Sequence, residues 1–221
     1  MPTTTPTLQA CRHCGAGAPL DAHFCPQCTK ILPLQRQADY FGFLGLPRKL
    51  NIDAADLEQR FRTLSRQFHP DYFYNAAPAE RRASLEKSSY LNDAYRTLRN
   101  PISRVDYLLK LEGLAAQGPE QASKQVPAGL LEEVFALNEE LDEVREQRSS
   151  GAPADVWKRR LERARQPIEA KRAEHEAQLK ELSARWDATG DRAVLEALRD
   201  RVLERNYINN LLATIEKELS A

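Results

Sequence analysis

The tripeptide His-Pro-Asp at positions 69–71 interrupts a strongly helical part of the chain and constrains how that part can fold. Before it, apolar side chains recur at steps of four, three and four residues across 57–68, which is one stripe of an amphipathic helix. Proline biases the preceding residue away from the helical region, so this helix ends at the tripeptide. A second helical pattern begins near Pro78 and ends at Leu98. The sequence therefore predicts an antiparallel helical hairpin with the tripeptide exposed at its tip.

The remainder of the chain is also helical in pattern, and strand signals are nearly absent. With 29% charged residues and nine glycines in 221 residues, the composition suits an all-α protein. Apolar periodicity predicts three further helices, at about 129–148, 154–187 and 191–219, which are enough for a small bundle. The expected domains are a cysteine-rich module at 1–35, the hairpin domain at 36–112, a linker containing Gly and Pro at 113–128, and a three-helix bundle at 129–221.

Targeting signals and charge limit the choice of partners. No apolar run approaches the roughly 18 residues that cross a bilayer, and the start MPTTTPTLQA has the features of neither a secretory nor a mitochondrial signal. We therefore expect a cytoplasmic protein without a membrane partner. Residues 1–100 carry 13 basic and 9 acidic side chains, against 19 and 23 in the rest of the chain. This asymmetry indicates two surfaces with different partners rather than one nucleic-acid face.

The cysteines fall in the first 28 residues, as two Cys-x-x-Cys pairs separated by ten residues. Because cytoplasmic thiols stay reduced, this spacing predicts a zinc-ribbon or zinc-knuckle site with four thiolate ligands. Four thiolates complete a tetrahedral ion and leave no open position, so a Zn²⁺ ion here would be structural. Disulfides, or iron in place of zinc, are the competing interpretations. The predicted ligands are Cys11, Cys14, Cys25 and Cys28.

Other residues of the cysteine-rich module carry weaker signals. His13 and His23 are expected to be bystanders, because four thiolates already satisfy the ion. Nucleic-acid binding has little support, since residues 8–35 contain two basic side chains, Arg12 and Lys30. The module could stabilise the N-terminus, mediate self-association or contact another protein, and the sequence does not choose among these roles.

His69 and Asp71 could form a catalytic acid–base pair or part of a contact surface. Catalysis would need a pocket and a further nucleophile or metal, which a hairpin tip does not offer. The chain has no glycine-rich phosphate loop, nucleophile elbow or open metal site, so an enzyme is not expected. On the preceding helix, Arg62 and Arg66 fall opposite the apolar stripe and Arg60 on its flank, where solvation alone could explain them. A rigid tip beside a basic helix face is better suited to pressing on another protein.

The first helix of the predicted bundle carries two rows of side chains. Apolar residues at 130, 134, 137, 141 and 144 already form a complete core stripe. Leu131, Phe135, Glu139 and Glu143 form a second row at steps of four, apolar at one end and acidic at the other. A wide core face could absorb the apolar pair. The alternative is a docking groove for a partner with a hydrophobic centre and a basic rim.

The second helix of the bundle contains Pro167 inside a continuous apolar stripe. Proline removes a helix hydrogen bond and clashes with the preceding turn, so a kink or a break is expected, and the unbroken stripe favours a kink. His175 lies on the same stripe and is expected to be a packed histidine rather than a ligand.

The order of a basic helix, the His-Pro-Asp tip and a helix carrying LNDAYRTL at 91–98 resembles a J-domain. J-domains are the modules through which co-chaperones stimulate ATP hydrolysis by a 70-kDa heat-shock chaperone. More specifically, DYFGFLGLP, RQFHPD, LRNPISRVDYLL and NEELDEV resemble the HscB family of iron–sulfur co-chaperones, over about residues 38–221. The tetracysteine module is similar to that of the eukaryotic relatives and is missing from the shorter bacterial ones.

The resemblance implies roles for both candidate surfaces. The tip would contact a chaperone of the HscA or DnaK type, with the arginines meeting an acidic surface on it. The second row, with an aromatic residue from the last helix, would bind an iron–sulfur scaffold protein of the IscU type. The implied chaperone-binding residues are His69, Pro70, Asp71, Arg60, Arg62 and Arg66, and the implied scaffold-binding residues are Leu131, Phe135, Glu139, Glu143 and Tyr207.

Three positions depart from the family pattern. Tyr72 stands where many J-domains have a lysine after the tripeptide, which removes one charge from the docking patch. Glu132 and Ala136 stand where the family often has an apolar residue and an acid. The resemblance predicts a non-enzymatic adaptor that brings a cluster-loaded scaffold to the chaperone and promotes cluster transfer. The alternative is a general J-domain adaptor whose zinc module serves other protein or nucleic-acid partners.

Overall fold

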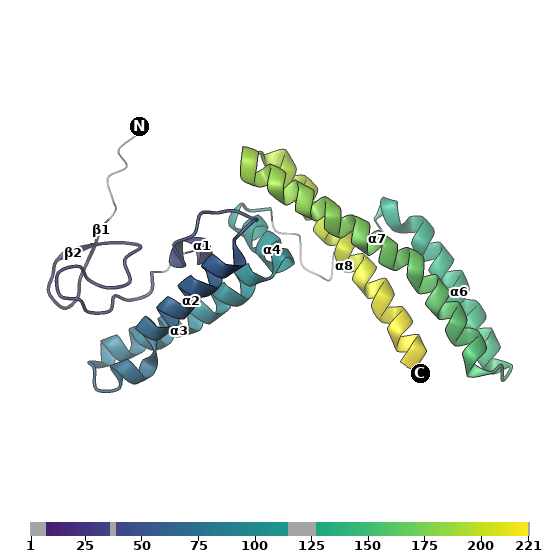
Figure 1. Ribbon diagram of the computed structural model, residues 1–221, viewed down its shortest axis with the longest axis horizontal. Helices are drawn as coiled ribbons and strands as arrows, with labels where there is room; N and C mark the ends of the chain where they lie inside the picture. Colours follow the sequence, from purple (N-terminus) through teal and green to yellow (C-terminus); the bar gives the residue numbers. More distant parts are fainter. Residues whose placement is uncertain (1–7, 36–38, 115–126, 221) are drawn as a thin grey trace. The chain divides into compact units, whose positions relative to one another are not determined.

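The computed structural model describes residues 8–35, 39–114 and 127–220. Within these residues the chain is mainly helical, with a two-stranded sheet near the N-terminus (Figure 1). The chain divides into two compact units, Met1–Arg104 and Val105–Ala221. The predicted all-α class is confirmed, and most of the predicted linker at 113–128 lies outside the described residues.

The sheet of the cysteine-rich module is small. Strand β1 (Leu8–Ala10) pairs antiparallel with β2 (Gly17–Pro19), and Leu8 lies opposite Pro19. At three residues each, neither strand is long enough to show the alternation of apolar and polar residues by which strands are found in a sequence. The sequence prediction therefore missed both strands.

The two Cys-x-x-Cys segments fold into the same kind of turn. The amide of Gly15 donates to the Cys11 carbonyl at 2.8 Å, and the amide of Thr29 donates to the Cys25 carbonyl at 2.9 Å. Gly15 and Thr29 both take a positive φ, of 74° and 60°. Glycine adopts this conformation freely, whereas a β-branched threonine is strained in it. Thr29 therefore takes a backbone conformation that threonine disfavours, and the surrounding turn keeps it there.

The hairpin domain is set by local helix signals. The Asp53 carboxylate caps one helix by accepting the Ala55 amide at 2.8 Å, and the Asn100 side chain caps another by accepting the Ile102 amide at 3.0 Å. Phe68, at the end of the stripe that predicted the hairpin, is fully buried. The helices are α1 (Tyr40–Phe43), α2 (Ala54–Phe68), the 3₁₀ turn η1 (Pro70–Phe73), α3 (Pro78–Arg99) and α4 (Pro101–Leu111).

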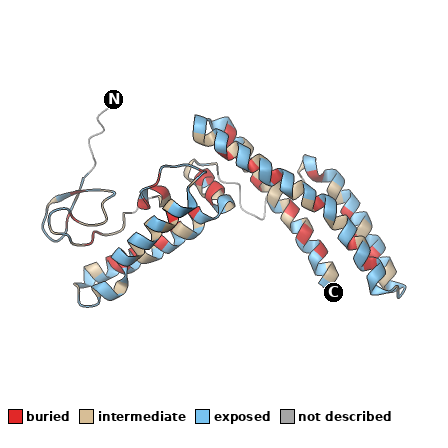
Figure 2. Cartoon of the chain, viewed as in Figure 1, coloured by how far each residue is buried: buried red, intermediate tan, exposed pale blue. Residues whose placement is uncertain are grey.

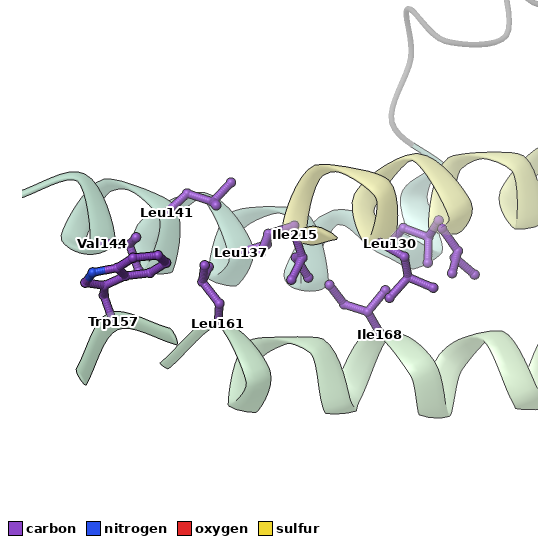
Figure 3. Close-up of a cluster of buried hydrophobic side chains, with 10 residues drawn as sticks. Leu130, Leu137, Leu141, Val144, Trp157, Leu161, Ile168 and Ile215 are labelled. Carbon is purple, nitrogen blue, oxygen red and sulfur yellow. The ribbon is translucent and has the colours of Figure 1, made fainter. Parts of the chain in front are cut away.

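The second unit contains the predicted three-helix bundle. After the 3₁₀ turn η2 (Ala128–Leu130) come α6 (Leu131–Ser149), α7 (Ala154–Thr189) and α8 (Arg192–Ser220). Buried residues recur along one side of each helix, as amphipathic helices require (Figure 2). Ten buried side chains form one cluster that meets between the three helices (Figure 3). Its buried members are Leu130, Leu137, Leu141, Val144, Trp157, Leu161, Ile168, Ile208, Leu212 and Ile215.

Helix α7 continues through Pro167 to Thr189, so the proline does not break it. The helix ends at Gly190, which takes a positive φ of 63° and donates its amide to the Trp186 carbonyl at 2.8 Å. His175 on this helix is 1% exposed, and burial lowers its pKa. The structure therefore places His175 in the interior, as the stripe predicted.

Candidate functional site

The cysteine sulfurs converge on one point of the module. The four Sγ atoms lie within 4.8 Å of one another, and the Cys11–Cys28 and Cys14–Cys25 pairs are each 3.7 Å apart. A tetrahedral ion with sulfur ligands at about 2.3 Å needs sulfurs roughly 3.8 Å apart, so the four thiols fit a metal ion with little rearrangement. All four cysteines are free thiols, which disfavours the disulfide interpretation.

The module also prepares one ligand for metal binding. Hydrogen bonds from the backbone amides of Cys14 and His13 lower the pKa of the Cys11 thiol to about 7. The thiolate is the form that binds metal, so these amides favour the binding-competent state. His13 contributes its amide, while its exposed ring lies outside the cysteine cluster.

The His-Pro-Asp tip projects from the end of α2. His69 leaves the helical conformation, with φ −58° and ψ 125°, as expected for a residue before proline. Its Nδ1 accepts the Asp71 amide at 3.4 Å and lies 3.5 Å from the Asp71 carboxylate. The side chains of His69 and Asp71 are 52% and 86% exposed. Both are therefore solvated surface groups, and the arrangement suits a contact surface better than an acid–base pair in a pocket.

The base of the tip is held from α3. Phe68 is fully buried. Its carbonyl oxygen accepts the hydroxyl of Ser84 at 2.7 Å and that of Ser88 at 2.9 Å. These bonds satisfy a carbonyl that the end of a helix would leave without a partner. The residue directly before His69 is thus fixed in place by the opposite helix of the hairpin.

The three predicted arginines of α2 have different surroundings. Arg60 donates to the Gly45 carbonyl at 2.8 Å and pairs with Asp56 at 2.8 Å, so it braces the connection between α1 and α2. Arg62 is 68% exposed and pairs with Glu58 on its own helix. Arg66 is exposed, and its guanidinium makes no ion pair with the described residues. The structure therefore brings two of the three arginines to a solvent-facing basic surface.

Two exposed aromatic side chains follow the tip in the chain. Tyr72, the residue at which the sequence departs from many J-domains, is 75% exposed. Tyr74 is 77% exposed, and sequence reasoning missed it. The three consecutive aromatic residues of DYFYN were its only signal, because the loop lacks the periodicity that separates buried from exposed positions. The surface around the tip is therefore aromatic as well as basic.

The second row of α6 lies outside the core. Phe135 is 67% and Leu131 41% exposed, whereas Leu137 is 3% exposed. The bundle core is complete without the pair, so a wide core face does not account for it. Glu139 and Glu143 are exposed further along the row, and Glu143 pairs with Arg160 of α7. On α8, Tyr207 packs partly buried against the same core cluster.

His23 makes a contact that sequence reasoning did not predict. It was expected to be a bystander of the metal site, and its ring does lie outside the cysteine cluster. The ring instead contacts the hairpin, where burial and the nearby Lys87 ammonium lower its pKa to about 4.

Among the described residues, none of the helices has the length and the apolar character of a membrane-spanning segment.

Comparison with known proteins gives consistent matches. Residues 39–107 match the DnaJ domain. The chain is 37% identical over 123 residues to the human iron–sulfur cluster co-chaperone protein HscB. It is 42% identical over 106 residues to the co-chaperone protein HscB homolog of Vibrio vulnificus strain YJ016. These matches cover 56% and 48% of this chain, and 52% and 61% of the two relatives. The chain thus spans about half of the curated relatives' length.

Solved structures extend the likeness over more of the chain. The crystal structure of human co-chaperone protein HscB superposes with a TM-score of 0.68 at 27% identity, covering 95% of this chain and 98% of that one. Chaperone HscB from Vibrio cholerae superposes with a TM-score of 0.57 at 28% identity, covering 82% and 97%.

Proposed function

The chain is an HscB-type J-domain protein, and from this premise we propose that it acts as a co-chaperone of iron–sulfur cluster assembly. In this role the tip at 69–71 stimulates ATP hydrolysis by a 70-kDa heat-shock chaperone of the HscA or DnaK type. The exposed row of α6 holds a cluster scaffold protein of the IscU type and delivers it to that chaperone. The chaperone performs the chemistry, and this chain acts by positioning.

One observation carries the proposal: the apolar end of the α6 row is exposed beside a core that is already complete. Phe135 is 67% exposed and Leu131 41%. An exposed aromatic residue beside a second apolar residue is the kind of anchor that protein interfaces use, and neighbouring carboxylates supply a charged rim. Glu139 and Glu143 supply that rim and favour a scaffold surface that is basic around an apolar centre.

The tip supports the chaperone half of the proposal. His69 and Asp71 are both exposed, and the Nδ1 atom of His69 accepts the backbone amide of Asp71, so the two side chains are accessible on a locally bonded turn. Arg62 and Arg66 add positive charge on α2, the helix that ends at the tip, and this charge speeds encounter with an acidic surface on the chaperone. Arg60 contributes less, because its guanidinium is already bonded to the connection before α2.

We propose Zn²⁺ as the ion of the cysteine module. Four thiolates in tetrahedral spacing are the donor set that zinc prefers in structural sites. When bound, the ion cross-links the two Cys-x-x-Cys turns and has no open position for a substrate. The ion then acts on the fold of the module rather than on any reaction.

Chaperone ATPase stimulation, measured with and without scaffold protein, tests the function. Wild type should accelerate hydrolysis, with a further increase when scaffold is present. His69→Gln should abolish stimulation and leave the far-UV circular dichroism unchanged, because the His69 side chain is 52% exposed and its contacts with Asp71 stay within the tip. His13→Gln, at an exposed histidine of the cysteine module, is the matched control and should retain stimulation. Equal rates for wild type and His69→Gln would remove the chaperone role.

A further inference from the structure

The cysteine-rich module contacts the hairpin through His23. The Nε2 atom of His23 lies 3.1 Å from the carbonyl oxygen of Phe43, and its Nδ1 atom lies 3.2 Å from the ammonium nitrogen of Lys87. Beside a carbonyl oxygen Nε2 must carry the hydrogen, which leaves Nδ1 as the acceptor for the ammonium. The two contacts therefore select the same neutral tautomer and hold the ring in one orientation.

Lys87 is a buried cation on the inner side of α3. It is 3% exposed, and its ammonium lies 5.6 Å from the ring centroid of Phe43 and 5.5 Å from that of Phe68. A buried charge is strongly unfavourable unless it is hydrogen-bonded. His23 supplies an acceptor for it, and the two aromatic faces add cation–π attraction. The hairpin therefore depends on the module for the environment of this lysine.

The same contact reaches the last residue of α2. The ring of His23 meets Phe68 edge-on, with centroids 5.0 Å apart, and the ring of Phe24 stacks on Phe68 at 6.0 Å. His69 follows Phe68 directly in the chain. A displacement of the Phe68 ring thus acts on the backbone from which the tip projects.

The other side of His23 is tied to the metal site. Cys25 follows two residues later, and the His23 carbonyl accepts the Leu32 amide at 2.9 Å. Grooves of about 750 Å³ and 450 Å³ both border His23. A partly buried ion pair, Lys30 with Glu80 at 3.2 Å, adds a second link to α3.

We propose that His23 is a positioning residue for the tip at 69–71, and that metal binding fixes the tip through it. This role rests on the proposed function, because it assigns the module a part in chaperone stimulation. With Zn²⁺ bound, the segment 21–25 is fixed and His23 holds Lys87 and Phe68. Without the ion the ring is released, Lys87 loses its acceptor, and the end of α2 gains freedom. The module then couples metal occupancy to co-chaperone activity.

The experiment uses the full chain in two states, loaded with one equivalent of Zn²⁺ and stripped by a chelator. The first readout is the set of amide resonances of residues 69–74, which requires no chaperone. In wild type these resonances should shift and broaden on stripping. In His23→Ala the zinc-loaded protein should already give the shifted spectrum, and stripping should change the tip no further.

The second readout is the co-chaperone concentration that gives half-maximal ATPase stimulation. It should rise about tenfold in zinc-loaded His23→Ala, as expected for loss of one hydrogen bond to a charged group, while the maximal rate is kept. Lys87→Met should behave alike and keep the fold, because methionine fills the space between two phenylalanines. His13→Ala is the control within the module, and it should change this concentration less than twofold.

The outcomes separate this proposal from the proposed function. If wild type fails to stimulate any chaperone while its tip resonances respond to zinc through His23, the function fails and the coupling stands. If the tip resonances of His23→Ala still respond to stripping as in wild type, His23 does not carry the coupling and the proposal is overturned. Unchanged tip resonances in stripped wild type would overturn it as well.

Discussion

Replacing Phe135 by alanine should abolish most scaffold binding while leaving the fold intact. The side chain is 67% exposed. Of the roughly 200 Å² that a phenylalanine can bury, about 130 Å² is therefore open to a partner. At about 25 cal/mol per Å², covering this area contributes up to about 3 kcal/mol, or roughly a hundredfold in Kd. The free energy of unfolding should change by less than about 0.5 kcal/mol, because the bundle core does not use this ring.

Titration calorimetry with the scaffold protein and urea unfolding of the free chain measure the two quantities. Leu137→Ala is the matched control on the same helix, because Leu137 is 3% exposed and belongs to the core. It should lower the free energy of unfolding by about 2–5 kcal/mol. The reasoning is refuted if Phe135→Ala destabilises the chain as Leu137→Ala does, or if it binds scaffold as tightly as wild type.

Two further predictions concern strain and buried charge. Thr29→Gly should stabilise the zinc-loaded chain by about 1 kcal/mol, because glycine adopts the positive φ of 60° without strain. The reciprocal Gly15→Thr should destabilise the chain. Thermal unfolding measures both effects, and equal melting temperatures for the variants and wild type would contradict the prediction. Burial lowers the pKa of Lys87 from 10.5 to about 8, so the unfolded chain binds more protons between these values. The free energy of unfolding should therefore rise between pH 8 and 10.5, by at most about 3 kcal/mol relative to Lys87→Met, and a constant difference between the two proteins would contradict it.

Local signals in the sequence predicted the helix ends, because each rests on contacts within a few residues. Pro70 ends α2 at Phe68 and Pro78 begins α3, and both act through their own backbone neighbourhood. Periodicity also located the buried stripes. It could not decide whether Leu131 and Phe135 belong to the core, because the width of a buried helix face is set by the neighbouring helices. That decision required α7 and α8 to be in place.

The role of Arg60 shows the same limit on the α2 surface. The resemblance placed it with Arg62 and Arg66 in a docking patch, and helix geometry put it on the flank of the apolar stripe. In the structure its guanidinium bonds to the Gly45 carbonyl, in a turn that glycine closes with a positive φ of 66°. An arginine on the flank of a helix can point to solvent or bond to a neighbouring segment. For Arg60 the position of the connection between α1 and α2 decides between the two.

The contact between His23 and Lys87 joins residues 64 apart, so no local pattern predicts it. One signal was nevertheless in the sequence. Lys87 precedes Leu91, Ala94 and Leu98 at steps of four, three and four, which places a lysine on the inner stripe of α3. A cation there requires a covering element that supplies an acceptor, and the metal module is that element. The module and the hairpin accordingly fall in one compact unit, Met1–Arg104, as the proposed coupling between the metal site and the tip requires.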